Sequence, residues 1–349
     1  MSARVLVGIV TCNSAPYLEA CLEGLGRQTF RDFDTALFDN ASRDGTAAIV
    51  GRHRDRFRSV CFSGENLGFA AAHNRLIGPS RSEYVLVLNP DVILDARFLE
   101  TLVAAMDGHP EAGAATGKLY RWRRHPGAPA APAPPRGPAE LDSTGIYFTS
   151  NQRHLDRGSG EYDTGQYDRE EWVFGASGAA AFYRRAMLED VRTGGEYFDE
   201  SFFAYREDAD LAWRARWMGW PCLYVPGATA LHERKVLPQR RASVPEAINM
   251  HSFKNRFLLR VKNMDPGTYA RNFLRITARD LLAVGYVLVR ERSSLRGLPL
   301  IARALPGALA ARRELKRRRR AAPREIRAWL SGRRSEPLGL RPGGAHTRR

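Results

Sequence analysis

The sequence predicts an α/β protein built on a doubly wound, mostly parallel sheet, followed by a helical, basic C-terminal extension. Two observations predict this class. Residues 4–117 alternate between short runs of β-branched and aliphatic residues and longer segments with helical periodicity, and such alternation is typical of parallel sheets with helices on both faces. From residue 244 onward, apolar positions are interleaved with arginine at helical spacing.

The elements can be placed in order along the chain. The expected strands of the first part are 4–10, 34–38, 59–62, 84–88 and 112–117, and the expected helices are 17–27, 46–54, 70–77 and 96–106. After a Pro/Ala-rich segment, 125–138, strand character returns at 171–183 and 223–225, with a helix at 208–218 between them. Ligands of such sheets bind at the carboxyl ends of the strands, so functional residues are expected directly after each strand.

The positive charge of the chain is concentrated at its C-terminal end. The net charge is +16, of which residues 290–349 carry +14, from 18 Lys and Arg against 4 Asp and Glu; the rest of the chain has 36 against 34, a net +2. The 44% of apolar residues exclude a disordered polymer. No apolar run is long enough for a membrane span or a signal-peptide core.

The four cysteines are widely spaced, with no CxxC pair. This spacing favours neither a zinc module nor a disulfide framework and is typical of a reducing, cytosolic compartment.

Polar turns follow the first two expected strands. Thr11 and Asn13 come after the first strand, and Asp39 ends the second. A carboxylate in this place can accept hydrogen bonds from a nucleobase imide or a ribose hydroxyl. The alternative is a structural turn, in which polar side chains of 40–46 cap the next helix. We expect Asp39 to be functional and Asp44 to be structural.

Two further loops follow the third and fourth strands. Asn66 and Gly68 open an alanine-rich helix, where backbone amides can approach a diphosphate, although such loops are common. Asn89 and Asp91 flank a proline just after the apolar strand 84–88. A carboxylate on this rim is well placed to hold a divalent cation between two phosphates, whereas an isolated Asn-Pro-Asp is more often a turn.

The second half offers carboxylates at a helix start. Glu207 and Asp208 open the expected helix after a small-residue loop, 174–180. The helix dipole stabilises them as bases, and the alternative is N-capping alone. His232 is a possible ligand, although a single histidine is more often a satisfied polar residue.

Taken in order, these segments resemble a family-2 glycosyltransferase of the GT-A fold, in its rhamnosyltransferase-like branch. The resemblance covers about residues 5–233, roughly two thirds of the chain. It is carried by the shared order and spacing of 10–13, 39–46, 65–70, 88–92, 198–200, 207–211 and His232. It implies a Rossmann-like nucleotide-binding half and an acceptor half.

The resemblance also implies how the donor is held. Thr11 and Asp39 would contact a pyrimidine base, and Asn66 would help to hold the nucleotide. Asp91, together with His232, would bind Mg²⁺ or Mn²⁺, because Asn89 stands where many relatives carry an aspartate. The complete donor-binding set is Thr11, Asn13, Asp39, Asn66, Gly68, Asn89 and Asp91.

In the same resemblance, Asp208 would be the general base of an inverting transfer, and Glu207 its supporting neighbour or an alternate base. The implied donor is dTDP-rhamnose, with a UDP-hexose as the alternative. The implied acceptor is a saccharide or lipid-linked saccharide of cell-envelope polysaccharide synthesis.

The basic extension indicates where in the cell the protein works. Amphipathic segments at 269–276 and 281–288, followed by the cluster 316–320, favour an anionic membrane surface, so the protein is expected to be peripheral on the inner face of the plasma membrane. The alternative is that these helices pack on the catalytic domain. A non-catalytic sugar-nucleotide-binding protein remains a rival, whereas nucleic acid is not an expected partner because the body is nearly neutral and lacks known nucleic-acid-binding motifs.

The predicted organisation has a catalytic domain at 1–243 with a nucleotide-sugar-binding half at 1–120 and an acceptor-binding half at 140–243. A helical, membrane-associating extension at 244–310 and a basic, disordered tail at 311–349 follow.

Overall fold

The computed structural model describes residues 2–123, 139–234 and 245–338, so the Pro/Ala-rich segment 125–138 lies outside the described residues. The main strands are β1 (Val5–Thr11), β2 (Phe33–Asp39), β3 (Ser59–Phe62), β4 (Tyr84–Leu88), β6 (Ala114–Arg121), β10 (Glu171–Val173), β11 (Ala180–Arg184) and β12 (Cys222–His232). The short strands are β5 (Val92–Leu94), β7 (Leu141–Ser143), β8 (Ile146–Phe148), β9 (His154–Asp156) and β13 (Glu336–Pro337). The α-helices are α1 (Ala15–Gly26), α2 (Thr46–Arg52), α3 (Gly68–Ile77), α4 (Phe98–Gly108), α5 (Arg185–Asp190), α6 (Glu207–Trp217), α7 (Glu246–Asn263), α8 (Pro266–Arg290), α9 (Gly297–Arg318) and α10 (Pro323–Trp329).

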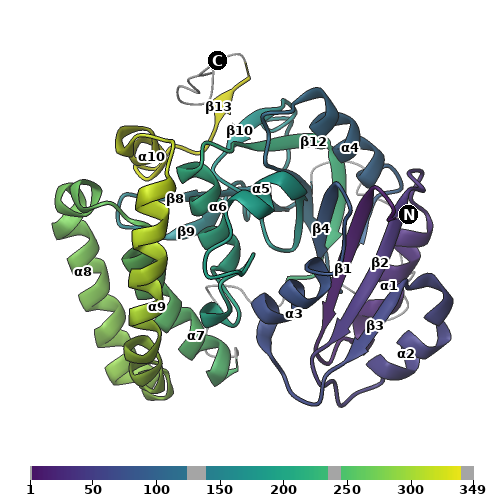
Figure 1. Ribbon diagram of the computed structural model, residues 1–349, viewed down its shortest axis with the longest axis horizontal. Helices are drawn as coiled ribbons and strands as arrows, with labels where there is room; N and C mark the ends of the chain where they lie inside the picture. The colour runs from purple at the N-terminus through teal and green to yellow at the C-terminus, as the bar shows by residue number, and fades with distance from the viewer. Residues whose placement is uncertain (1, 124–138, 235–244, 339–349) are drawn as a thin grey trace.

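One mixed sheet runs through the molecule in the order β13-β10-β12-β6-β11-β4-β1-β2-β3 (Figure 1). Strands β3, β2, β1 and β4 are parallel neighbours. Strand β11 lies antiparallel between β4 and β6, and β6 pairs in parallel with β12. The predicted α/β class with flanking helices is therefore confirmed, and the antiparallel β11 separates the parallel strands β4, β1, β2 and β3 from the parallel pair β6 and β12.

Alternating side chains of the central strands build two cores, one on each face of the sheet. Val5, Val7 and Ile9 of β1 pack into one core, and Leu6 between them packs into the other, as the two-residue period of a strand requires. Helices α1, α2 and α4 contribute to the first core, and α3 and α5 to the second. Helix α6 contributes to both, so it joins the sheet to the helices that follow.

The expected strand boundaries match the structure at some strands and differ at others. The predictions at 59–62 and 84–88 agree with β3 and β4. The strand expected at 171–183 is divided into β10 and β11, because the intervening residues form the small-residue turn. Strand β12 extends beyond the expected 223–225 to His232, across an irregularity between Tyr224 and Thr229. The short strands escaped prediction because three residues carry too little periodicity.

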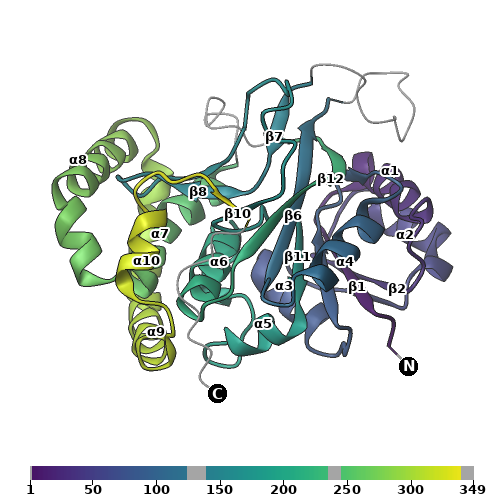
Figure 2. The same cartoon turned by 90° about the horizontal axis from the view of Figure 1, so that it is seen from above.

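The C-terminal helices form a lobe at one side of the sheet, with α6 between the lobe and the sheet (Figures 1 and 2). The expected disorder from residue 311 is wrong for residues 311–338. Helix α9 continues to Arg318, α10 follows, and β13 pairs with β10 at the sheet edge. The remaining tail residues, 339–349, lie outside the described residues. In the part of the chain that the structure describes, no helix is long and apolar enough to cross a membrane.

Candidate active site

The first part of the site is a buried carboxylate at the end of β2. Thr11 Oγ1 donates to Asp39 Oδ1 at 2.7 Å. The Ser42 amide and hydroxyl donate to Asp39 Oδ2 and Oδ1 at 2.9 and 2.5 Å. Asn13 closes the turn from the β1 side, because its Oδ1 accepts from the Arg43 amide at 2.8 Å. The side chain of Asp39 is therefore held in one orientation by its own turn and by the neighbouring strand.

The turn before α3 lies next to this carboxylate. Asn66 Oδ1 accepts from the Gly68 amide at 2.9 Å, and its Nδ2 lies 3.4 Å from Cys12 Sγ. Gly68 has a φ of +83°, and a Cβ at this position would lie 2.6 Å from the carbonyl oxygen of Phe203. Only glycine fits here, since both the backbone conformation and the space exclude a side chain.

The sequence analysis gave Asn40 only a turn role, but this buried side chain connects the two turns. Its Nδ2 donates to the Gly68 carbonyl at 3.1 Å, and its Oδ1 accepts from the Leu67 amide at 3.0 Å. The sequence did contain a signal for this role, because Asn40 directly follows Asp39, the last residue of β2.

Asp91 and His232 come together at the rim of β4. Strands β5 and β12 pair antiparallel with His232 opposite Val92, which brings His232 Nε2 to 3.5 Å from Asp91 Oδ1. The other ring nitrogen, Nδ1, lies 2.7 Å from Oδ2 of the buried Asp142. Burial alone would lower the pKa of His232, but the carboxylates of Asp142 and Asp91 outweigh it and raise the pKa to about 9.

Asp142, which the sequence analysis missed, is the anchor of this arrangement. Its Oδ1 also pairs with Arg234 Nε at 2.9 Å, and Arg234 in turn pairs with Asp156 at 2.6 Å. The short strands that carry these residues gave no periodic signal in the sequence.

Asp91 and His232 are the pair that would hold a divalent cation, which would then replace the Nε2 proton that the neighbouring carboxylates favour. A carboxylate oxygen and an imidazole nitrogen face each other, and the second ring nitrogen is held by a buried carboxylate, as in many metal sites. Within the described ranges, no group of three or more His, Cys, Asp or Glu side chains could hold a metal ion. A cation shared by Asp91 and His232 would therefore complete its coordination with water or substrate phosphates, as Mg²⁺ commonly does.

Glu207 and Asp208 are the first two residues of α6. Asp208 Oδ2 accepts from the Gly178 amide at 3.1 Å, so the small-residue turn before β11 orients this carboxylate. Glu207 is buried. Burial and, secondarily, the adjacent Asp208 carboxylate raise the pKa of Glu207 well above its usual range. This direction favours the protonated form of Glu207, so of the two carboxylates we retain Asp208 as the predicted base.

Two neighbouring side chains connect these parts. Burial, followed by the charges of Glu207 and Asp91, raises the pKa of Tyr205 to about 12, which places its phenol within the influence of both carboxylates. His154 lies in the field of Asp208, whose charge opposes the lowering of the His154 pKa by burial. Asn89 is positioned by its backbone, whose amide donates to the Ala179 carbonyl at 2.9 Å. Thr11, Asn13, Asp39 and Asn89 thus lie at or just after the carboxyl ends of β1, β2 and β4, whereas Glu207 and Asp208 lie at the start of α6.

Comparison with known proteins identifies the family. A model of glycosyl transferase family 2 matches residues 6–192, more than half of the chain. The chain belongs to this family. The chain of this glycosyltransferase is also 32% identical over 240 residues to the N-acetylglucosaminyl-diphospho-decaprenol L-rhamnosyltransferase of Mycobacterium tuberculosis, covering 64% of this chain and 74% of that protein. A cholesterol galactosyltransferase of Borreliella burgdorferi is 28% identical over 99 residues, 28% of each chain.

Solved structures agree on the fold of the glycosyltransferase. S. aureus TarS 1–349 in complex with UDP-GlcNAc is similar with a TM-score of 0.52 and 18% identity, covering 94% of this chain and 87% of that chain. GalNAc-T7 with UDP, GalNAc and Mn²⁺ gives a TM-score of 0.56 at 12% identity, covering 76% and 48%. At such identities the similarity shows the fold alone, and it confirms the predicted GT-A class.

Proposed function

We propose that this glycosyltransferase moves rhamnose from dTDP-rhamnose to a hydroxyl of a lipid-linked saccharide, with inversion at the anomeric carbon, in cell-envelope polysaccharide synthesis. The observation that carries the proposal is the 32% identity over 240 residues to a protein named as a rhamnosyltransferase acting on a polyprenyl-diphosphate-linked sugar. A UDP-hexose donor is the alternative, and it differs from the first proposal in the base and the sugar alone.

The proposed donor site uses the turns after β1, β2 and β3. Asp39 would accept from the imide N–H of the pyrimidine, because Thr11 and Ser42 hold its carboxylate while a carboxylate has room for further donors. Asn66 and the backbone of Gly68 would meet the ribose and the diphosphate. The closeness of Gly68 to the Phe203 carbonyl keeps this turn in place.

Asp91 and His232 would hold Mg²⁺ or Mn²⁺ beside the diphosphate, with Asn89 next to them on the rim. The cation would supply positive charge to stabilise the departing nucleoside diphosphate. Asp142 would keep the His232 ring oriented, because it binds the nitrogen that faces away from Asp91.

Asp208 would remove the proton of the acceptor hydroxyl as its oxygen attacks the anomeric carbon. The amide of Gly178 fixes the direction of this carboxylate. Glu207, whose pKa is raised by burial, would support the start of α6 beside the base.

The test is a donor panel with a lipid-linked acceptor. Purified protein is incubated with dTDP-rhamnose, UDP-hexoses and N-acetylglucosaminyl-diphospho-polyprenol, with and without a chelator, and the anomeric configuration of the product is read by NMR. We expect dTDP-rhamnose to be used in preference, with inversion, and the chelator to suppress transfer. Preference for a UDP-hexose would establish the alternative donor, and donor binding without turnover would support a non-catalytic protein.

We also propose that the enzyme works as a peripheral protein on the inner face of the plasma membrane, through the outer side of α8. Leu274, Leu281, Leu282 and Val289 are 79%, 67%, 69% and 72% exposed. Their spacing of seven, eight and fifteen residues places them on one side of the helix, and α8 lies at the outer edge of the molecule in both views (Figures 1 and 2). Exposed apolar surface of this kind marks an interaction site.

The charge around this side of α8 favours an anionic lipid surface. Arg271 and Arg275 are exposed on the same helix. The expected polybasic cluster 316–320 is partly used inside the protein, because Arg318 bonds the Asp190 carbonyl and Arg320 pairs with the Asp190 carboxylate. The arginines of α8 are therefore better placed than that cluster to meet lipid headgroups.

Vesicle cosedimentation tests this surface. Leu274→Gln combined with Leu281→Gln should release the protein from vesicles that contain anionic lipid, while donor hydrolysis in solution is unchanged. The matched control is Leu298→Gln with Leu309→Gln, at exposed leucines of α9. Equal release by both pairs would show that α8 is not the membrane-facing surface.

A further inference from the structure

The loop 199–206 that leads into α6 has an unusual backbone. Phe203, Tyr205 and Arg206 have φ values of 64°, 70° and 73°. Side-chain-bearing residues rarely adopt this region, and they keep it only where the surroundings hold them there. The next two residues are Glu207 and Asp208, so the conformation of this loop determines where the proposed base lies.

Helix α7 supplies contacts that hold the loop. The fully buried Asn255 directs its Nδ2 at the carbonyl oxygens of Phe202, Ala204 and Tyr205, at 2.8, 2.9 and 2.7 Å. Lys254 Nζ, one residue earlier, bonds the Ser201 carbonyl. Since an amide group carries only two N–H bonds, the three carbonyls share its donors. One side chain therefore holds the turn at three of its carbonyl groups.

The far side of the same loop touches the donor turn. The ring of Phe203 stacks on His251 of α7, with centroids 4.4 Å apart and an interplanar angle of 12°. The Phe203 carbonyl accepts from the Ala70 amide of α3 at 3.1 Å, and its atoms occupy the space that a Cβ of Gly68 would need. The loop therefore extends from α7 to the proposed diphosphate-binding turn.

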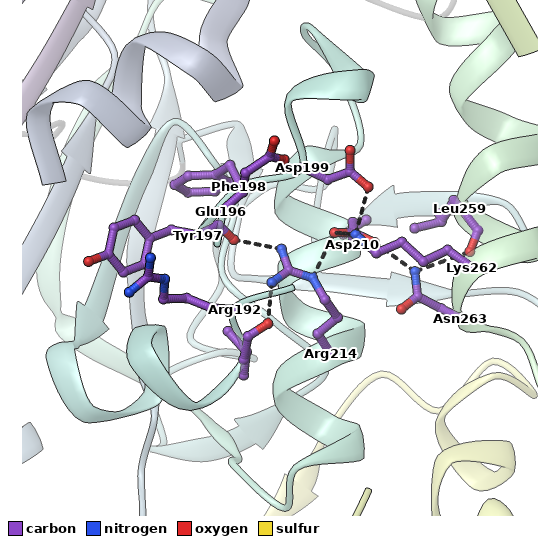
Figure 3. Close-up of polar contacts among 12 residues, drawn as sticks. Arg192, Glu196, Tyr197, Phe198, Asp199, Asp210, Arg214, Leu259, Lys262 and Asn263 are labelled. Carbon is purple, nitrogen blue, oxygen red and sulfur yellow. Dashed lines mark hydrogen bonds and ion pairs between the residues drawn. The ribbon is translucent and has the colours of Figure 1, made fainter. Parts of the chain in front are cut away.

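A buried ion network fixes α7 itself against α6 (Figure 3). Lys262 Nζ bonds Asp199 Oδ2 at 2.7 Å and Asp210 Oδ2 at 2.9 Å, and Asn263 Nδ2 bonds Asp210 Oδ1 at 2.7 Å. Asp210 also pairs with Arg214 at 2.8 Å. Both ends of the loop, Asp199 and the start of α6, are thereby tied to the helix that carries Asn255.

We infer that Asn255 is a positioning residue for transfer, and that the catalytic unit extends into α7 beyond the predicted boundary at residue 243. Asn255 holds the loop 199–206 in the conformation that sets Asp208 against the donor turn. The inference rests on the proposed role of Asp208 as the base. Asn255 touches no substrate in this account, and it acts through the loop.

The main variant is Asn255→Ala, which removes the shared donor and leaves the carbonyls of the loop without it. We expect the kcat of transfer to fall by about ten- to a hundredfold, because a small displacement of a catalytic group is costly. The donor Kd from calorimetry should stay within about twofold, because the turn at Gly68 keeps its own bonds to Asn40 and Asn66 when the loop loosens. Amide hydrogen exchange at Phe203 and Ala204 should become faster, since their amides bond within the held turn. The matched control is Asn272→Ala on α8, whose Nδ2 bonds only the Thr268 carbonyl of its own helix at 3.1 Å, and it should change neither quantity.

A folded Asn255→Ala protein with unchanged kcat and unchanged exchange would overturn the inference, as would a loss of donor affinity in proportion to kcat. If Asn255→Ala does not fold, His251→Ala takes its place, because it removes only the ring that stacks on Phe203. A severalfold loss of kcat with an unchanged donor Kd would then support the inference, and an unchanged kcat would overturn it. The exchange measurement needs no substrate, so it separates this inference from the proposed function. If Asp208→Asn turned over normally, the assignment of Asp208 as the base would be wrong. The exchange measurement would still report whether Asn255 holds the loop.

Discussion

The proposed nucleotide side and the proposed base side of this enzyme hold their carboxylates in different ways. Asp39 is held by Ser42, three residues away, and by Thr11 on the adjacent strand. Asp208 follows a loop whose holding contacts come from Asn255 and Lys262, about fifty residues later in the chain. The position of Asp39 therefore depends on hydrogen bonds within its own turn and the neighbouring strand. The position of Asp208 depends on how the C-terminal helices pack against α6.

The two regions also differ in how charge is buried. Near Asp39 the carboxylate is satisfied by hydroxyl and amide groups. Beside the base, Lys262, Asp210 and Arg214 are fully buried charges that compensate one another. Removing one member of such a set leaves the others without compensation, so the base side should be the more fragile region.

The largest effect is expected at the base. Asp208→Asn keeps the size of the side chain and part of its capping ability, so folding and donor affinity should survive. The transfer rate should fall by roughly a hundredfold or more, the usual contribution of a general base. The rate is measured with saturating donor and acceptor, beside donor affinity from calorimetry.

Glu207→Gln is the matched control for that variant, because it makes the same change of carboxylate to amide at the neighbouring residue, where burial raises the pKa and favours the neutral form. It should lower the rate far less than Asp208→Asn. The opposite ranking would assign the base to Glu207 and show that burial does not keep it protonated.

The next effect concerns the stability of the base side. Lys262→Met leaves Asp199 and Asp210 buried without their ammonium partner, and we expect a loss of about 3–5 kcal/mol in the free energy of unfolding. Urea denaturation measures it. Lys316→Met, at an exposed position of α9, should change this free energy by less than about 0.5 kcal/mol. A loss of unfolding free energy for Lys262→Met as small as that for Lys316→Met would show that the base side is no more fragile than the nucleotide side.

The stability of the base side should also depend on pH, through the carboxyl group of Asp199. Burial would raise the pKa of Asp199, but the Lys262 ammonium and the hydrogen bonds outweigh it and lower the pKa to about 2. A carboxyl group with a depressed pKa in the folded state contributes stability above its unfolded pKa, near 4, and loses it as the pH falls toward 2. The expected loss over that window is about 2 kcal/mol.

This titration is isolated by comparing the wild type with Asp199→Asn at pH 5 and at pH 2.5. The stability advantage of the wild type should shrink on acidification. An advantage that stays constant across the window would show that the Asp199 pKa is not depressed.

The same contrast explains what the sequence could predict. Strand β4 and the turn around Asp39 were predicted because their signals, an apolar run and a polar strand end, are contained in a few adjacent residues. Asp142 and Asn255 were missed because their partners, His232 and the loop 199–206, are ninety and about fifty residues away. Such pairings depend on tertiary packing, which no local pattern records.

The expected disorder beyond residue 311 failed for a related reason. The arginine-rich composition suggested a solvated end, but Arg320 caps the Met218 carbonyl and Arg216 of α6 lies over the Trp329 ring at 4.3 Å. Arginine stems and guanidinium planes pack on apolar and aromatic surface. A high count of arginines therefore does not distinguish a disordered tail from a packed one.

The smallest effect is expected in the nucleotide half, at Ser42→Ala. The variant removes the 2.5 Å hydroxyl bond to Asp39 Oδ1 and the 2.8 Å bond that the Ser42 hydroxyl accepts from the Asn13 amide, but Thr11 and the amide of residue 42 still hold the carboxylate. One hydrogen bond of this kind contributes about 1 kcal/mol net, so the unfolding free energy should fall by about 1–2 kcal/mol and the donor Kd should rise severalfold. Ser59→Ala, at an exposed position of β3, is the control and should leave both quantities unchanged. A loss at Ser42 as large as that at Lys262 would show that the turn around Asp39 also depends on distant contacts, and the distinction between a locally held donor site and a remotely held base would fail.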